Sequence, residues 1–160
     1  TVHGDNRGYF METYNENDMK EAGIDIKFVQ DNQSASTKGV LRGLHRQINY
    51  PQSKLVRVIK GSVFDVAVDM RENSPTYLKW YGIELTEENK KQFLISKGFA
   101  HGFLVLSDYA EFCYKVDDFF HPNDEGGIAY NDPTIGVKWP ISDDMVLNLS
   151  EKDKAWKPLK

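Results

Sequence analysis

Apolar and polar residues alternate along most of this chain in short runs, the pattern that half-buried β-strands produce. In residues 62–70, the side chains at 64, 66, 68 and 70 are apolar and share one face, whereas Asp65 and Asp69 fall on the other. Lys60 and Gly61 precede this run and predict a tight hairpin turn. Nine strands are predicted in this way, over residues 9–13, 27–34, 40–45, 54–59, 62–70, 79–85, 92–95, 102–106 and 110–117.

One short helix is predicted from Glu16 to Ala22, with Gly23 at the position of its C-terminal cap. A parallel α/β sheet would need a crossover helix between successive strands, and the chain has no room for such helices. Many short strands with little helix therefore predict an all-β sandwich or barrel. No repeat, low-complexity tract or linker interrupts the pattern, so residues 1–160 are expected to form a single domain.

Charge and cysteine content narrow the classes of partner and location. The formal net charge of −4 argues against nucleic acid or an anionic membrane as a partner. Cys113 is the single cysteine, so no intrachain disulfide can form, which favours a cytoplasmic location. Nothing at the N-terminus resembles a secretory signal, and no apolar run is long enough to cross a bilayer. The chain opens at Thr1 and enters patterned sequence at once, so we expect that an upstream segment is missing.

The run from Gly39 to His45 combines apolar, strand-forming residues with two glycines, an arginine and a histidine, which strand formation alone does not require. Arg42 suits an anion because its planar guanidinium donates hydrogen bonds in pairs, and His45 is suited to proton transfer near neutral pH. A tight strand end, with a histidine that binds only a backbone carbonyl, explains the same residues equally well. In a regular strand Arg42 and His45 point to opposite faces, so a bulge at Gly43 would be needed to re-aim one of them.

Other candidate residues also allow a structural reading. His101 again stands beside a glycine at a strand entrance, and a buried hydrogen-bonding histidine would look the same. Zinc or non-haem iron needs three or four ligands, and neither His45 nor His101 has a second ligand close in sequence, so no metal site is predicted. Tyr114 alone is typical of a core tyrosine with its hydroxyl at the rim. Ser150 and Asp153 have the spacing of a helix capping box, which needs no further role.

Taken in order, the segments resemble the dTDP-4-dehydrorhamnose 3,5-epimerase family from end to end. The matching residues are 4–10 with Glu12, 28–32 with Ser34 and Ser36, 39–45, 54–58, 65–71 with 74–76, 98–103, 110–112 with 114–115, 131–132, 139–140 and 149–150 with 152–153. The resemblance implies a cupin-type jelly roll of two antiparallel sheets, used without a metal or another cofactor. It also implies a dTDP-sugar substrate and a homodimer whose N-terminal strands are shared between subunits. Family members usually begin with one more strand than this chain.

The same resemblance implies roles for individual residues. It makes His45 the general base, Asp153 the carboxylate that orients it, Tyr114 the acid on the opposite face of the sugar, and Lys54 the cation beside the keto oxygen. Positions that hold the nucleotide, the diphosphate or the sugar are matched by Arg7, Glu12, Gln30, Asp31, Asn32, Arg42, His101, Glu125 and Lys152. The implied reaction is epimerisation at C3 and C5 of dTDP-4-dehydro-6-deoxy-D-glucose, which gives dTDP-4-dehydro-L-rhamnose.

Two departures from the family leave alternatives open. Phe119 and Phe120 stand where adjacent tyrosines are common, and the loop over residues 48–53 is slightly short. Epimerisation at one carbon, on a related nucleotide sugar, would use the same base and acid. A sugar-nucleotide binder without activity and a metal-dependent cupin enzyme are the alternatives from other classes.

Overall fold

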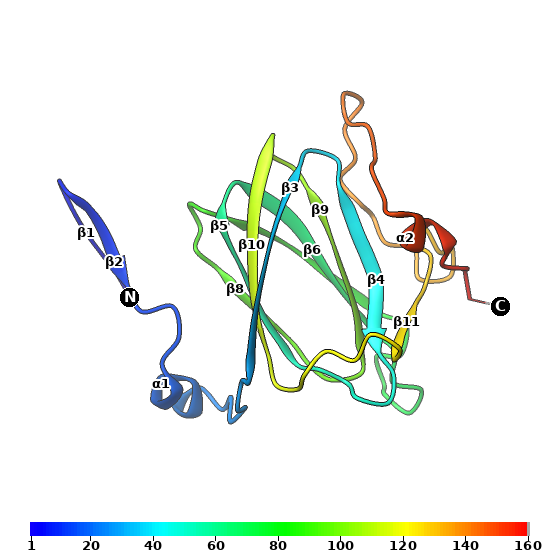
Figure 1. Ribbon diagram of the computed structural model, residues 1–160, viewed down its shortest axis with the longest axis horizontal. Coiled ribbons are helices and arrows are strands. Elements are labelled where there is room, and N and C mark those ends of the chain that lie inside the picture. Colours follow the sequence, from blue (N-terminus) through cyan, green and yellow to red (C-terminus); the bar gives the residue numbers. More distant parts are fainter. Residues whose placement is uncertain (160) are drawn as a thin grey trace.

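The computed structural model describes residues 1–159 as three antiparallel sheets and two short helices (Figure 1). A four-stranded sheet has the order β3-β10-β5-β8, a five-stranded sheet has the order β11-β4-β9-β6-β7, and β1 and β2 form a separate hairpin. The strands are β1 (Val2–Asp5), β2 (Gly8–Met11), β3 (Gln30–Thr37), β4 (Leu41–Gln47), β5 (Lys54–Lys60), β6 (Ser62–Asp69), β7 (Trp80–Thr86), β8 (Gln92–Ile95), β9 (Phe99–Val105), β10 (Tyr109–Val116) and β11 (Glu125–Gly127). The helices are α1 (Glu16–Glu21) and α2 (Glu151–Ala155).

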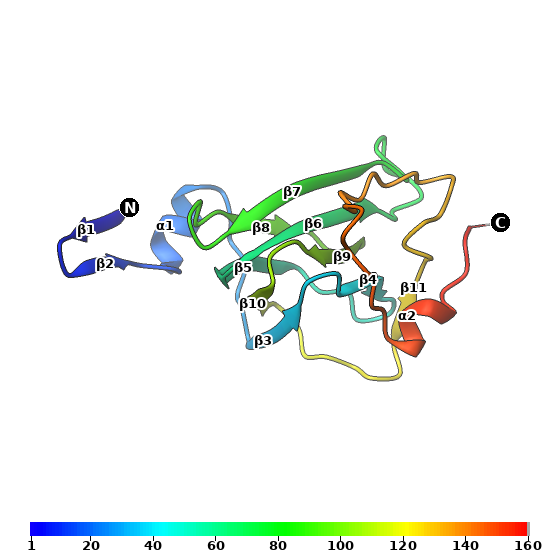
Figure 2. The same cartoon turned by 90° about the horizontal axis from the view of Figure 1, so that it is seen from above.

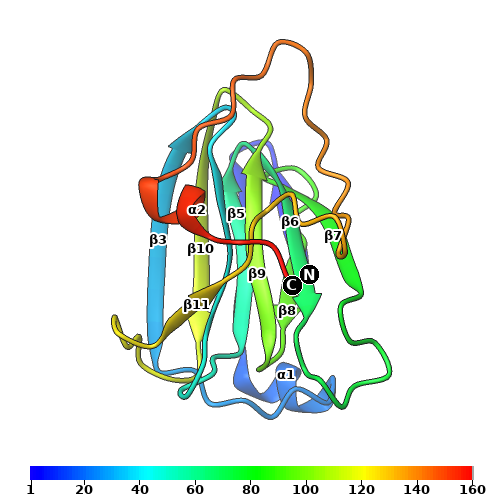
Figure 3. The ribbon, with the colours of Figure 1, turned by 90° about the vertical axis from the view of Figure 1, so that its right-hand side faces the viewer.

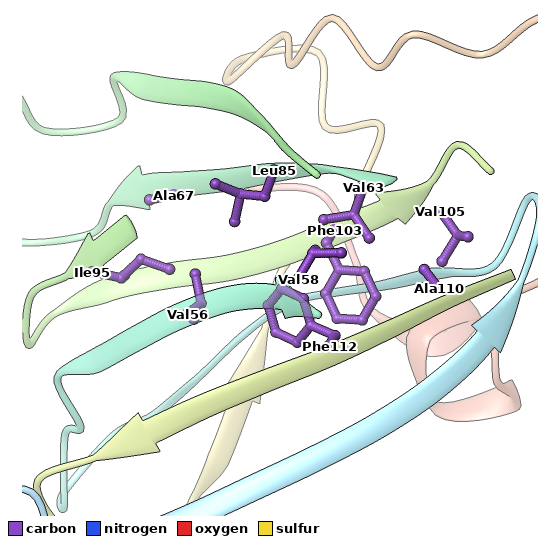
Figure 4. Packing of buried hydrophobic residues seen from close by; sticks show 10 residues of the cluster. All are labelled: Val56, Val58, Val63, Ala67, Leu85, Ile95, Phe103, Val105, Ala110 and Phe112. Carbon is purple, nitrogen blue, oxygen red and sulfur yellow. The ribbon is translucent and has the colours of Figure 1, made fainter. Parts of the chain in front are cut away.

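The two larger sheets pack face to face and bury an apolar core between them (Figure 2). Side chains from β5 and β10 meet side chains from β6 and β9 in this core, among them the stacked rings of Phe103 and Phe112, whose centroids lie 4.3 Å apart (Figure 4). Alternation along each strand produces this arrangement, because every second residue faces the opposite sheet. The predicted all-β jelly roll is therefore confirmed.

Strand β6 corrects one expectation from the sequence. Asp65 and Asp69 were assigned to the more polar face of a half-buried strand, yet both are buried, at 0% and 1% exposure. Their face is the one that points between the sheets. The other face is also covered, because Val66 and Val68 pack against apolar residues of the segment that follows β11 (Figure 3). A strand buried on both faces can carry acidic residues inward when those residues find partners.

The nine predicted strands all occur, with shifts of a few residues at their ends. The strand predicted over 27–34 begins at Gln30, and the one predicted over 102–106 begins at Phe99. The predicted helix ends at Glu21, and Gly23 follows it with a φ of 83°, as a glycine after a helix commonly does. Strands β1 and β11 were not predicted, because each is very short and lacks an apolar alternation. Helix α2 was indicated only by the capping-box spacing of Ser150 and Asp153.

The N-terminal hairpin projects away from the two larger sheets (Figure 1). All but the last of its strand residues are exposed, including the large apolar side chains of Tyr9 and Phe10 at 59% and 68% exposure. Large apolar side chains on a projecting arm are typical of a surface that meets another chain. In the described part of the chain, no helix has the length and apolar character needed to cross a membrane.

Candidate active site

Strand β4 carries a bulge that turns two functional side chains to the same side. Arg42 lies opposite Phe103 on β9, and His45 lies opposite His101, with a shift of register between these two pairs. Gly43 sits at the shift with a φ of 114°, and a Cβ atom there would lie 2.5 Å from the carbonyl oxygen of His101. Glycine tolerates both the positive φ and the close approach. The predicted bulge is confirmed, and it lets Arg42 and His45 both face the space between the sheets.

That space opens into a cavity of about 550 Å³ at one end of the two sheets. Its lining comes from both sheets, from the loops beside them and from α2. The residues are Asn32, Gln33, Ser34, Arg42, His45, Arg46, Gln47, Gln52, Lys54, His101, Gly102, Phe103, Phe112, Tyr114, Phe120, Glu125, Ser150, Lys152 and Asp153. Cations, carboxylates and amides thus converge on one concave site, as is usual for a site that binds a small molecule.

His45 and Tyr114 stand on opposite walls of this cavity. His45 belongs to β4 of the five-stranded sheet, whereas Tyr114 belongs to β10, between Asn32 on β3 and Val56 on β5. Lys54 lies at the start of β5, with its Nζ atom 5.8 Å from the centre of the Tyr114 ring. The cavity therefore presents an imidazole from one side, and a phenol with a nearby ammonium group from the other.

Two carboxylates flank the His45 ring. The Nδ1 atom lies 3.6 Å from Oε1 of Glu125, and the Nε2 atom lies 3.9 Å from Oδ1 of Asp153. Burial lowers the pKa of His45 to about 4, with the charge of Lys54 acting in the same direction and the two carboxylates opposing both. The imidazole is therefore neutral at pH 7 and can accept a proton. The imidazolium that results would be stabilised by the carboxylates on either side.

The two groups on the opposite wall have complementary protonation. Burial lowers the pKa of Lys54 to about 8, although Asp65 and Glu125 favour its charged form, so this side chain is mostly cationic at pH 7. Burial also raises the pKa of Tyr114, against smaller effects of Arg42 and Asn32, so its phenol keeps its proton. A neutral acceptor, a protonated donor and a cation are thus available at the same pH.

Asp65 is a buried residue of the site whose role the sequence did not reveal. Its carboxylate oxygens lie 2.8 and 3.0 Å from Nε2 of His101, and Lys54 interacts favourably with the same carboxylate. This pair fixes the orientation of His101, so the interpretation of His101 as a buried, hydrogen-bonding histidine is correct. Its ring also lines the cavity. The only sequence signal was an acidic residue inside an apolar strand, which is equally typical of a polar strand face.

Helix α2 reconciles the two readings of Asp153. The hydroxyl of Ser150 accepts a hydrogen bond of 3.1 Å from the backbone N–H of Asp153, which is the capping half of the motif. The Asp153 side chain does not complete a capping box. It is buried, and its Oδ1 atom has no hydrogen-bond partner among residues 1–159 and faces His45 instead. Helix α2 lies beside β4 (Figures 1 and 3). The cap therefore positions the carboxylate at the site.

The cavity gathers nine of the thirteen predicted site residues. They are Asn32, Arg42, His45, Lys54, His101, Tyr114, Glu125, Lys152 and Asp153. Gln30 stands beside them, since its amide donates to Asn32 over 2.8 Å. Asp31 points to the outer face of its sheet and pairs with Lys115. Among residues 1–159, no group of three or more His, Cys, Asp or Glu side chains has an arrangement that could hold a metal ion.

Arg7 and Glu12 lie outside the cavity of their own chain. Arg7 is on the projecting hairpin and pairs with Asp5, whereas Glu12 accepts from Asn15 just before α1. A sequence motif records which residues a site needs, but it does not record from which copy of the chain each residue comes. The structure therefore leaves these two residues without a place in the site of the same chain.

A jelly roll with a base, an acid and cations in one cavity defines a class of protein suited to proton transfer on an anionic ligand. The family profile described as dTDP-4-dehydrorhamnose 3,5-epimerase matches residues 1–160, and the chain belongs to this family. The family predicted from the sequence is thus confirmed.

Known relatives agree over nearly the whole chain. The dTDP-4-dehydrorhamnose 3,5-epimerase of Methanothermobacter thermautotrophicus is 54% identical, over 99% of this chain and 86% of the relative. The crystal structure of dTDP-6-deoxy-D-glucose-3,5-epimerase from Legionella pneumophila, in complex with dTDP-4-keto-L-rhamnose, has a TM-score of 0.95 at 51% identity and covers 99% of this chain and 84% of that one. A more distant structure, a 3'-monoepimerase from Streptomyces bikiniensis in complex with dTDP-quinovose, has a TM-score of 0.91 at 31% identity and covers 99% and 80%.

Proposed function

We propose that this chain is an isomerase that epimerises C3 and C5 of dTDP-4-dehydro-6-deoxy-D-glucose to give dTDP-4-dehydro-L-rhamnose. The observation that carries the proposal is the placement of His45 and Tyr114 on opposite walls of one cavity, with Lys54 beside them. Inversion at carbon needs removal of a proton from one face and its return from the other. Family membership adds the substrate to this geometry.

The first step is proton abstraction by His45. A proton on a carbon next to a ketone is a weak acid, and its removal becomes feasible when a nearby cation stabilises the enolate oxygen. Lys54 supplies this charge to the C4 oxygen. Neutral His45 takes the proton, and Asp153 and Glu125 stabilise the imidazolium that forms.

The second step is return of a proton by Tyr114 from the opposite wall. Its raised pKa keeps the phenol protonated until the enolate has formed. The C3 and C5 carbons both flank the C4 ketone, so one base and one acid can serve both when the sugar shifts or its ring flips. Solvent resupplies the phenol and removes the proton from His45 after each inversion, so that both groups are reset before the second carbon reacts and before the next turnover.

Cations around the cavity hold the rest of the substrate. Arg42 and Lys152 are placed to bind the diphosphate, and the amide of Asn32, with Gln30 hydrogen-bonded beside it, is placed for the nucleotide, which the family resemblance assigns to this strand. Asp31 lies on the outer face and has no such place in the cavity of its own chain. Binding energy from these remote groups positions the sugar against the base.

We place the enzyme in the cytoplasm, where a single-cysteine chain needs no disulfide.

The proposed assembly is a homodimer in which the hairpin of β1 and β2 reaches the partner chain. In that arrangement, Arg7 and Glu12 complete the partner's cavity rather than their own. The projecting hairpin with exposed Tyr9 and Phe10 supports this assignment. A chain that binds the substrate through a second copy would be inactive as a monomer.

Solvent exchange followed by NMR tests the reaction. In D2O, the wild-type enzyme should replace the C3 and C5 protons of the substrate with deuterium and yield the L-rhamno product. The variant His45→Asn should bind dTDP with unchanged affinity and lose exchange at both carbons. Wild-type enzyme that exchanges neither position would overturn the proposal, and full exchange in the variant would assign the base to another residue.

Epimerisation at a single carbon is the second candidate, because a 3'-monoepimerase shares this fold at 31% identity. Both reactions use the same base and acid, so the cavity lining does not separate them. The labelling pattern does, since a single-carbon enzyme would fully label only C3 or only C5.

A further inference from the structure

Gln47 occupies the end of β4, two residues beyond His45 and on the same face of the strand. The side chain is buried, with 5% exposure, and lines the cavity. Its Oε1 atom accepts a hydrogen bond of 2.8 Å from the backbone N–H of His121. This bond fixes the orientation of the carboxamide, because only the oxygen can accept.

The other end of the same carboxamide is unused. The Nε2 atom of Gln47 is buried and has no hydrogen-bond partner within residues 1–159. Buried polar groups nearly always have a partner, since an unpaired donor loses its hydrogen bonds to water without replacement. A buried amide that lines a binding cavity and keeps a donor free is therefore arranged to meet an acceptor on a ligand.

The position of Gln47 indicates which part of the ligand it meets. In the antiparallel pairing of β4 with β11, Gln47 lies opposite Glu125, and His45 lies opposite Gly127. Both His45 and Glu125 belong to the reacting end of the cavity, where the base works on the sugar. The diphosphate is an anion and is best bound by the cations Arg42 and Lys152. The neutral carboxamide N–H of Gln47 is better suited to donate to a hydroxyl or carbonyl oxygen.

We infer that Gln47 is a specificity-determining residue whose amide N–H donates to an oxygen of the hexose in the bound nucleotide sugar. This inference rests on the proposed function and adds a sugar contact that the predicted site residues do not include. The same carboxamide also ties down the segment that carries Phe120, another cavity residue, through His121. Sugar recognition and the order of this segment thus depend on one side chain.

Two substitutions separate these roles. Gln47→Glu keeps an oxygen that can accept from His121 but removes the N–H donor, whereas Gln47→Met keeps the length and removes both. Binding is measured with two probes, dTDP and dTDP-glucose, where dTDP-glucose adds a hexose that has no ketone and does not react. We expect Gln47→Glu to bind dTDP within about twofold of wild type and to lose about tenfold in affinity for dTDP-glucose, as expected for a lost hydrogen bond in a polar site. Its kcat/KM should fall by at least the same factor.

Asn131→Asp is the matched control, because Asn131 is exposed outside the cavity and the substitution makes the same change from amide to carboxylate. It should leave both affinities unchanged. Equal affinity of Gln47→Glu and wild type for dTDP-glucose, with a loss only in Gln47→Met, would show that Gln47 merely holds the loop and would overturn the inference. An equal loss for both probes in Gln47→Glu would also overturn it. A wild-type enzyme without C–H exchange would refute the proposed function, while the two binding probes would still decide the role of Gln47.

Discussion

His45 combines burial with charged neighbours in a way that sets its working pH range. Burial and Lys54 lower its pKa to about 4, so the imidazole stays unprotonated well below the pH at which a free histidine charges. At the other end, the pKa of Lys54 is lowered to about 8, and this group must be protonated to stabilise an enolate. The base is therefore lost at acid pH and the cation is lost at alkaline pH.

The pH dependence of kcat/KM should accordingly form a broad plateau with limbs near pH 4 and pH 8. Replacement of Lys54 by Gln should remove the alkaline limb and move the acid limb to higher pH, because the cation no longer depresses the pKa of His45. Initial rates across the pH range, with folding verified by fluorescence at each pH, measure both effects. An acid limb near pH 6.5 in the wild type would show that the free histidine value survives in the cavity, contrary to this expectation.

Single residues differ in how far the sequence predicts them. His45, Tyr114 and Asp153 follow from a resemblance that spans the chain, and the structure brings them to one cavity. Asp65 could not be assigned, because an acidic residue in an alternating strand looks the same whether its face meets solvent or the other sheet. Its burial depends on the packing of two sheets and a later segment, which local alternation does not encode.

At the scale of elements, the bulge in β4 is the feature that places the site. A residue with a side chain at position 43 would have to adopt a φ of 114°. Its Cβ atom would lie 2.5 Å from the carbonyl oxygen of His101. Gly43→Ala should therefore lower the free energy of unfolding by about 2 kcal/mol or more and disturb the register that brings Arg42 and His45 to one face. Chemical denaturation and kcat/KM measure the two consequences.

Gly23→Ala is the control for backbone strain alone. Gly23 also has a positive φ, of 83°, but no atom lies within 4 Å of the position that a Cβ would take. We expect it to cost about 1 kcal/mol and to leave turnover unchanged. Similar stability losses for Gly23→Ala and Gly43→Ala would mean that the close approach to His101 contributes nothing.

Helix α2 is a second element on which the site depends. Loss of the Ser150 hydroxyl removes the hydrogen bond to the backbone N–H of Asp153, so Ser150→Ala should cost about 1 kcal/mol in stability. Since the same turn holds the Asp153 carboxylate opposite His45, kcat should also fall by about tenfold or more. Thermal unfolding and steady-state kinetics on the same samples measure the two effects.

Thr86→Ala removes a comparable side-chain cap from the turn after β7, where the Thr86 hydroxyl accepts a hydrogen bond of 2.8 Å from the backbone N–H of Asn89. It should cost a similar amount of stability with no loss of kcat, because neither Thr86 nor Asn89 lines the cavity. A proportional loss of kcat in both variants would indicate a general effect of destabilisation rather than misplacement of Asp153.

Elements, too, differ in how well the sequence predicts them. The strands with clear alternation were found within a few residues of their observed ends, because burial of one face dominates their sequence. Strand β11 has the sequence Glu-Gly-Gly, in which both glycines reflect close approach by Ile48 and Trp156 rather than strand propensity. Tertiary contacts with neighbouring segments stabilise such a strand, so its local sequence does not predict it.

At the scale of the whole molecule, the position of Arg7 on the projecting hairpin raises the question of whether it contributes to the cavity of its own chain or to that of a partner chain. Within one chain, Arg7 is exposed and outside the cavity, although the family resemblance assigns it to substrate binding. A homodimer that exchanges its hairpins resolves this conflict. In that case each cavity is built from the His45 of one chain and the Arg7 of the other.

Mixing two inactive variants tests this composite site. Arg7→Ala and His45→Asn should each lose most activity as separate homodimers. After unfolding and refolding of an equimolar mixture, about half of the dimers should be mixed, and each mixed dimer should hold one cavity with both native residues, which restores about a quarter of wild-type turnover. If both residues served the cavity of their own chain, every cavity in the mixture would lack one of them and no activity would return. Sedimentation analysis of the same samples verifies that the species are dimers, so that a failure of assembly is not mistaken for a site built within one chain.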